Sequence, residues 1–155
     1  MFKVACIQLR SDNVEKNNLD RTKKFILQAV KEKADLILTP ECSSIFSLNK
    51  KKLQEICKNM YEDFYVKEIR VLAKKYKKWI LIGSAIVKSS GKKLVNRSIL
   101  INDKGIIVSF YDKINMYDVK LNKKEKYCES KIFNKGKKIS TYNLPWGKLG
   151  MTICY

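Results

Sequence analysis

The first third of the chain alternates between strand-like and helix-like spacing of hydrophobic residues. Residues 2–9 are mostly apolar or β-branched over the length of a strand, and the polar residues 11–13 then supply side chains suited to a helix N-cap. Apolar residues recur at helical spacing over residues 14–33, which predicts a helix with one stripe against a sheet. Residues 36–38 form a short, buried type of strand that stops before Pro40, because proline has no amide hydrogen for a sheet ladder.

The middle of the chain continues with a long helical pattern and then turns to strands. Helical spacing extends over residues 53–76, with a break expected near Tyr61. Residues 79–87 then form an apolar run of strand type. Two further β-rich runs at 95–101 and 106–111 are separated by Asn-Asp-Lys-Gly, which predicts a β-hairpin.

The last third is more polar. Residues 120–138 predict a long surface loop or a short helix followed by a loop, whereas 139–143 and 148–155 predict two strands joined by a turn at Pro145. Strands and helices alternate early and strands follow one another later. This order predicts an α/β sandwich with both parallel and antiparallel strand pairs.

Composition limits the chemistry that the chain can perform. A length of 155 residues with 45% hydrophobic residues suits one domain with its own core. The first residues lack the pattern of a signal peptide, and apolar runs such as 79–82 are too short to cross a bilayer, so we expect a cytoplasmic protein without a membrane partner. Five cysteines without histidine or a Cys-x-x-Cys pair favour reduced thiols and exclude the usual zinc sites. Carboxylate, lysine and thiol groups are left for catalysis.

The net charge of +18 raises the possibility of a nucleic-acid partner. The sequence contains only four arginines, so 29 of its 33 basic residues are lysines, whereas base and phosphate recognition favours the planar arginine side chain. The lysines are also spread along the chain without interleaved aromatic residues. We therefore expect no nucleic-acid function.

Three reactive groups follow predicted strands, at Glu41, Lys113 and Cys154. Ligands of open α/β sheets bind at the carboxyl ends of strands, so these groups are candidates for one site. A carboxylate can deprotonate a thiol, and a lysine ammonium can stabilise the negative charge on an attacked carbonyl oxygen. Taken singly, each has an ordinary explanation as a solvated glutamate, a surface lysine or a buried cysteine.

Longer motifs carry a family resemblance. The segments at 38–41 (Leu-Thr-Pro-Glu), 111–114 (Tyr-Asp-Lys-Ile) and 147–155 (Gly-Lys-Leu-Gly-Met-Thr-Ile-Cys-Tyr) resemble, in order and spacing, the Glu, Lys and Cys motifs of the nitrilase superfamily of carbon–nitrogen hydrolases. Residues 3–9 resemble the first strand of that family. The resemblance covers the whole chain, and the joint occurrence of three motifs makes it specific.

The resemblance implies a role for each residue. Cys154 would be the nucleophile, Glu41 the general base and Lys113 the stabiliser of the tetrahedral oxyanion, with the backbone amide of Tyr155 as a second oxyanion donor. Glu129 would support the lysine and the substrate. Attack on an amide would give a thioester that water hydrolyses to a carboxylic acid, without a metal or an organic cofactor.

Residues 113–119 are similar to the branch of ω-amidases and deaminated-glutathione amidases, which act on small linear amides that carry a carboxylate; Asn115 stands where that branch commonly has histidine. The family implies an α-β-β-α sandwich that continues for on the order of 100 residues past the cysteine. We therefore expect 1–155 to be the amino-terminal part of a single carbon–nitrogen hydrolase domain, with an incomplete sandwich, and a homo-oligomer at full length. The alternative is an inactive truncated remnant or interaction module of the same fold.

Overall fold

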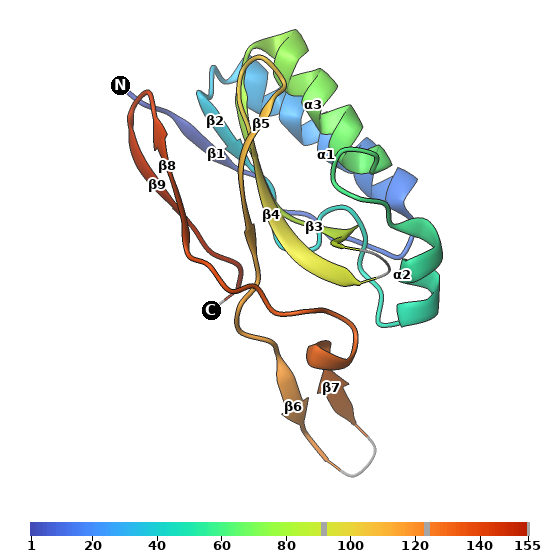
Figure 1. The fold of residues 1–155 in the computed structure, drawn as a ribbon. Helices are drawn as coiled ribbons and strands as arrows, with labels where there is room; N and C mark the ends of the chain where they lie inside the picture. The colour runs from blue at the N-terminus through green and yellow to red at the C-terminus, as the bar shows by residue number, and fades with distance from the viewer. Residues whose placement is uncertain (91–92, 123–124, 155) are drawn as a thin grey trace.

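The central element is a five-stranded sheet in which the strands follow one another in chain order. The computed structural model describes residues 1–90, 93–122 and 125–154 (Figure 1). The sheet consists of β1 (Val4–Cys6), β2 (Leu36–Leu38), β3 (Trp79–Lys88), β4 (Leu94–Ile101) and β5 (Ile107–Asp112). The first three strands are parallel, and β3, β4 and β5 pair antiparallel. The predicted mixture of parallel and antiparallel pairing is confirmed.

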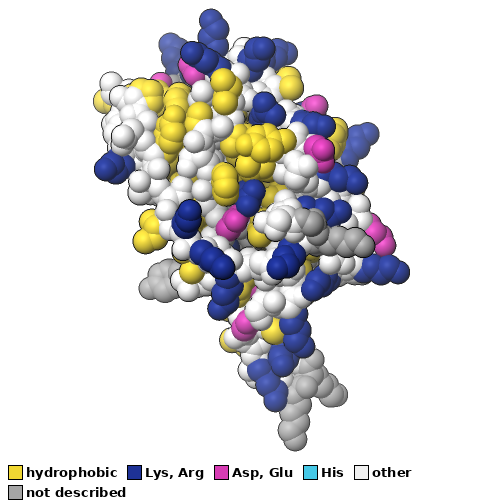
Figure 2. Space-filling model, in the orientation of Figure 1, with side chains coloured by type: hydrophobic (Ala, Val, Ile, Leu, Met, Phe, Trp, Pro, Cys, Tyr) yellow, Lys and Arg dark blue, Asp and Glu magenta, His cyan; other side chains and the backbone are white. Residues whose placement is uncertain are grey.

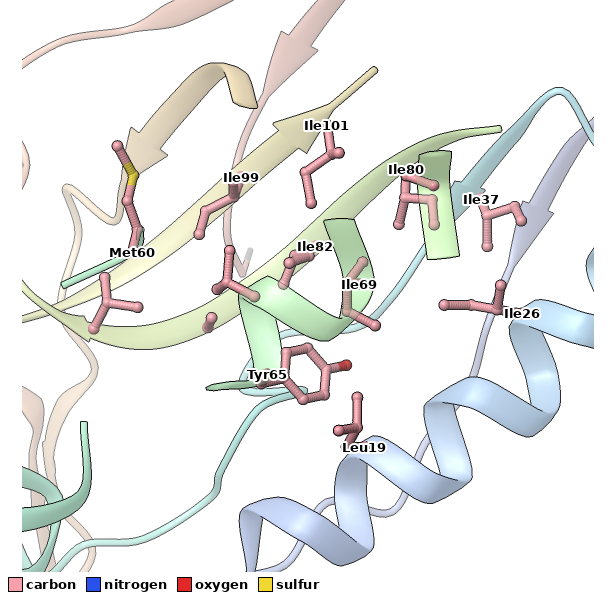
Figure 3. Close-up of a cluster of buried hydrophobic side chains, with 14 of the residues drawn as sticks. Leu19, Ile26, Ile37, Met60, Tyr65, Ile69, Ile80, Ile82, Ile99 and Ile101 are labelled. Carbon is pink, nitrogen blue, oxygen red and sulfur yellow. The ribbon is translucent and has the colours of Figure 1, made fainter. Parts of the chain in front are cut away.

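Two helices cover one face of this sheet (Figure 1). They are α1 (Glu15–Lys31) and α3 (Phe64–Tyr76), and the shorter α2 (Lys50–Ile56) lies between them in the chain. The apolar stripes of α1 and α3 meet the sheet in a buried cluster that includes Leu19, Ile26 and Ile69 (Figure 3). The break expected near Tyr61 separates α2 from α3, as predicted.

The start of α1 differs from the expectation of an N-cap within 11–13. The N-cap residue is Val14, which makes no side-chain capping bond. Asp12 instead accepts a hydrogen bond from the Val14 backbone at 2.8 Å, because its short carboxylate reaches the amide two residues on. At α3 the Asp63 side chain caps the helix by accepting from the Val66 amide at 3.1 Å.

A β-hairpin covers the opposite face of the sheet. It consists of β8 (Ser140–Leu144) and β9 (Gly147–Met151), which pair antiparallel. Met151 and Ile153 pack in a second buried cluster with Leu36, Leu81 and Leu100 from the sheet. The described residues therefore stack as helices, sheet and hairpin, with apolar contacts on both faces of the sheet (Figure 1).

The polar stretch 120–138 is more ordered than predicted. Strand β6 (Asp118–Lys120) ends at the start of this stretch and pairs antiparallel with β7 (Lys126–Cys128), so that the two form a small ribbon. The 3-10 helix η1 (Glu129–Lys131) follows β7. These strands are too short and too rich in charged residues to show apolar alternation, so the pattern gave no strand signal. The ribbon extends away from the sheet in Figure 1. At the other end of the chain β1 is shorter than the expected strand over 2–9.

Basic side chains are spread over the face of the molecule that Figure 2 shows. Figure 2 shows Lys and Arg side chains distributed around the visible face, with apolar side chains gathered over the middle of its upper half. Within the ranges that the structure describes, no helix is both long and apolar enough to span a bilayer.

Candidate active site

The loop after β2 carries Glu41 and is held against β3 by short polar contacts. The Gly83 amide donates to Thr39 Oγ1 at 3.1 Å, and the Cys42 amide donates to Ser84 Oγ at 2.9 Å. A Cβ atom at Gly83 would overlap the Thr39 carbonyl oxygen. The absence of a side chain at Gly83 therefore lets this loop approach β3 closely, which brings Glu41 over the end of the sheet.

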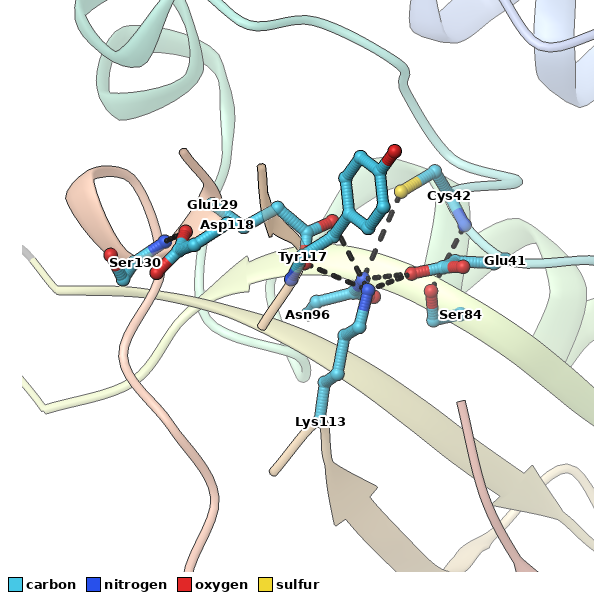
Figure 4. Close-up of polar contacts among 9 residues, drawn as sticks. All are labelled: Glu41, Cys42, Ser84, Asn96, Lys113, Tyr117, Asp118, Glu129 and Ser130. Atoms are coloured by element: carbon cyan, nitrogen blue, oxygen red, sulfur yellow. Dashed lines mark hydrogen bonds and ion pairs between the residues drawn. The ribbon is translucent and has the colours of Figure 1, made fainter. Parts of the chain in front are cut away.

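Lys113 follows β5 directly, and its side chain is buried beside Glu41. Because β2 and β5 run in the same direction through the sheet, their carboxyl ends lie at the same edge. Lys113 is 2% exposed, and its Nζ lies 2.8 Å from Glu41 Oε1 and 2.8 Å from Glu129 Oε2 (Figure 4). Burial alone would lower the pKa of Lys113, but the bonds and charges of Glu129 and Glu41 outweigh it and hold that pKa above its usual range. The ammonium therefore stays charged.

Glu129 reaches this site from the ribbon that the sequence pattern did not predict. It begins η1, directly after β7, and its Oε2 also accepts the Tyr117 amide at 2.8 Å. The Ser130 amide donates to Asp118 Oδ1 at 3.0 Å, which ties η1 back to the first strand of the ribbon. The ribbon thus holds the Glu129 carboxylate against Lys113.

Asn96 is a residue of the site that the sequence analysis missed. It lies in the middle of β4, is fully buried, and donates from Nδ2 to Glu41 Oε1 at 2.8 Å (Figure 4). Its backbone carbonyl accepts the Lys113 amide at 2.9 Å. The polar segment Asn-Arg-Ser within an otherwise apolar strand could have indicated this residue, because a buried strand position normally carries an apolar side chain.

Cys154 lies shortly after β9 and is exposed, with a left-handed φ of 65°. It borders a cavity of about 470 Å³ whose lining also includes Lys113, Asn115 and Tyr117. Among the described residues, no hydrogen bond joins Cys154 to Glu41 or Lys113. Tyr155, proposed from sequence as an oxyanion donor, lies outside the described residues.

The neighbouring thiol of Cys42 has a different environment. Burial, followed by the charges of Glu41 and Glu129, raises the pKa of Cys42 to about 12. A thiol with so high a pKa holds almost no thiolate at neutral pH and is a poor nucleophile. The Cys154 thiol, by contrast, is exposed and borders the cavity that Lys113 also lines.

The described site combines two carboxylates, a buried ammonium and an exposed thiol at one end of an α/β sheet. This combination is suited to covalent hydrolysis of an acyl compound, because a carboxylate can take a proton from a thiol and an ammonium can stabilise an oxyanion. Fold and site thus define an α/β protein with a Glu–Lys–Glu cluster at the carboxyl end of its sheet and an exposed thiol beside a cavity that the lysine also lines.

Comparison with known proteins names the family. The family model described as carbon-nitrogen hydrolase matches residues 3–155, so the chain belongs to the carbon–nitrogen hydrolase family, and the predicted resemblance is confirmed. The omega-amidase NIT3 of Saccharomyces cerevisiae is 33% identical over 99% of this chain and 55% of its own length. A deaminated glutathione amidase of Yersinia enterocolitica is 30% identical over 98% of this chain and 54% of its own.

Solved structures agree with the predicted fold. The Caenorhabditis elegans NitFhit protein matches all of this chain and 39% of its own, with a TM-score of 0.87 and 26% identity. Saccharomyces cerevisiae Nit3, described as a member of the nitrilase superfamily, matches 99% of this chain and 55% of its own, with a TM-score of 0.82 and 27% identity. The chain spans about half the length of the omega-amidases and deaminated glutathione amidases that it matches.

Proposed function

We propose that the whole protein is an amidase that hydrolyses the amide of a small carboxylic acid through a thioester on Cys154. The observation that carries this proposal is the contact of one buried ammonium, Lys113 Nζ, with Glu41 and Glu129, both at 2.8 Å, beside the cavity that Cys154 borders. Two carboxylates against one ammonium leave a net negative charge, which can accept a proton.

In the first half of the proposed reaction, Glu41 takes the thiol proton as Cys154 Sγ attacks the amide carbon. Lys113 stabilises the oxyanion of the tetrahedral intermediate, and its raised pKa keeps it protonated throughout. Glu41 returns the proton to the leaving nitrogen, so that ammonia departs as the carbon–nitrogen bond breaks. The acyl group is left as a thioester on Cys154.

In the second half, Glu41 takes a proton from water as the water oxygen attacks the thioester. Collapse of the second tetrahedral intermediate breaks the carbon–sulfur bond, returns the proton to the Cys154 sulfur and releases a carboxylic acid. Glu129 keeps Lys113 in place through both halves, because it bonds Nζ with both carboxylate oxygens, at 2.8 and 3.1 Å.

The proposed substrates are small linear amides that also carry a carboxylate. The similarity to proteins named omega-amidase and deaminated glutathione amidase supports this class, and a cavity of about 470 Å³ suits a small molecule. We further propose that the protein works in the cytoplasm, without a nucleic-acid partner, and as a homo-oligomer at full length.

The test is release of ammonia from the monoamide of succinic acid. Cys154→Ala, Glu41→Gln and Lys113→Met should each abolish turnover, whereas the matched cysteine control Cys42→Ala should retain it. Iodoacetamide labelling followed by mass spectrometry should place the adduct on Cys154. Turnover that survives Cys154→Ala would refute the thioester mechanism, and an inactive protein that still folds would favour the interaction module.

A further inference from the structure

We propose that Asn96 is a positioning residue that fixes the Glu41 carboxylate and leaves its Oε2 as the oxygen that accepts the proton. The inference rests on the proposed amidase function. It assigns different tasks to the two oxygens of one carboxylate, one to anchoring and the other to proton transfer.

The two carboxylate oxygens of Glu41 differ in their hydrogen bonds. Oε1 accepts from Asn96 Nδ2 and from Lys113 Nζ, each at 2.8 Å. Within the described ranges of the chain, no group donates to Oε2. Two donors on one oxygen fix the plane of the carboxylate, and the second oxygen keeps its lone pairs for a proton.

The orientation of the Asn96 amide follows from this contact. A carboxylate can only accept, so the nitrogen of the amide must face Glu41. The amide oxygen then points elsewhere, and Asn96 Oδ1 is buried without a hydrogen-bond partner among the described residues. A buried polar atom without a partner is unfavourable for stability.

Packing does not account for an asparagine at this position. Leu94 and Leu100 lie on the same face of β4, since alternate residues of a strand share a face, and both are buried in apolar clusters. An apolar side chain at residue 96 would avoid the unpartnered oxygen. What the asparagine adds is the donor to Glu41, together with a longer contact from the same Nδ2 to Cys42 Sγ at 3.9 Å.

Asn96 also aligns the other charged partner through its backbone. Its carbonyl accepts the Lys113 amide at 2.9 Å, one step beyond the last paired residues of β4 and β5. Asn96 therefore holds both the Glu41 side chain and the backbone of Lys113. A shift at this strand position changes the geometry of both groups.

The kinetic test compares Asn96→Leu with Ser98→Ala in the whole protein. Ser98 lies on the same strand face and also carries a buried oxygen without a partner among the described residues, but it makes no bond to Glu41. Asn96→Leu should lower kcat by about 100-fold with little change in KM, as expected for misplacement of a catalytic group. The acidic limb of the pH profile should move to higher pH, because the ionised carboxylate has lost a donor. Ser98→Ala should match the unaltered protein, and an unchanged kcat and pH profile in Asn96→Leu would overturn the proposal.

A second measurement does not depend on turnover. Denaturation of the unaltered chain, Asn96→Leu, Glu41→Gln and the double variant forms a cycle that reports the coupling between the two side chains. Non-additive effects on the unfolding midpoint support the contact, and additive effects overturn it. Failure of the amidase proposal would appear separately, as turnover that is absent or that survives Cys154→Ala.

Discussion

Replacing Lys113 by methionine should destabilise the chain strongly, because it removes the buried cation between the two carboxylates of the described site. Methionine keeps an unbranched stem of similar length but has no ammonium. The Lys113 side chain is 3% exposed, and its Nζ lies 2.8 Å from carboxylate oxygens of both Glu41 and Glu129. Removing one partner of a buried ion pair costs about 3–5 kcal/mol, and here two carboxylates lose the same partner.

The contribution of Lys113 to stability depends on pH in a direction that its pKa fixes. The pKa of Lys113 lies above its usual range, so its contribution to the free energy of unfolding is fully present below pH ~10.4 and is lost as the pH rises through the pKa of the folded state. The deficit of Lys113→Met should therefore stay the same between pH 7 and pH 9.

The assay is urea denaturation of the chain at pH 7 and pH 9, with Lys23→Met as the matched control. Lys23 makes a slightly shorter ion pair, 2.6 Å from Glu68, but both side chains are 34% exposed. An exposed pair contributes at most about 1 kcal/mol, so the control should lose little stability. Equal losses in the two variants at pH 7, or a Lys113→Met deficit that shrinks between pH 7 and pH 9, would refute the reasoning.

Three further predictions concern other parts of the chain. Burial raises the pKa of Glu15 to about 7, so the folded state becomes less stable as the pH rises from about 4.5 through 7. Glu15→Gln should therefore raise the free energy of unfolding by on the order of 1 kcal/mol at pH 8 and not at pH 4, as measured by denaturation. Gly83→Ala should lower stability by about 1–3 kcal/mol because its Cβ has no space, whereas Gly150→Ala, which meets nothing within 4 Å, should be tolerated in the same thermal melts. With limiting iodoacetamide at pH 8, mass spectrometry should find Cys42 modified far more slowly than Cys154, because burial raises its pKa to about 12; equal rates would contradict this environment.

The hydrophobic pattern predicted most of the regular elements. Helix α1, strands β2 and β3, and the β4–β5 hairpin lie close to where the pattern put them, because each has enough residues to show its period. The β6–β7 ribbon was missed for the opposite reason, since each of its strands has only three residues and half of the six are charged. The N-cap of α1 differs from the prediction because the Asp12 side chain accepts the amide of Val14, the N-cap residue, and caps no amide within the helix.

The sequence by itself determined the order of the main helices and strands, the family and the identity of the candidate groups Glu41, Lys113 and Cys154, because these depend on local spacing and on motifs. Only the tertiary structure decided which groups touch. Asn96 reaches Glu41 across 55 positions of the chain, and Lys113 reaches it across 72. Such contacts depend on strand direction and register and on the close approach of a loop to β3, and side-chain periodicity carries none of that information.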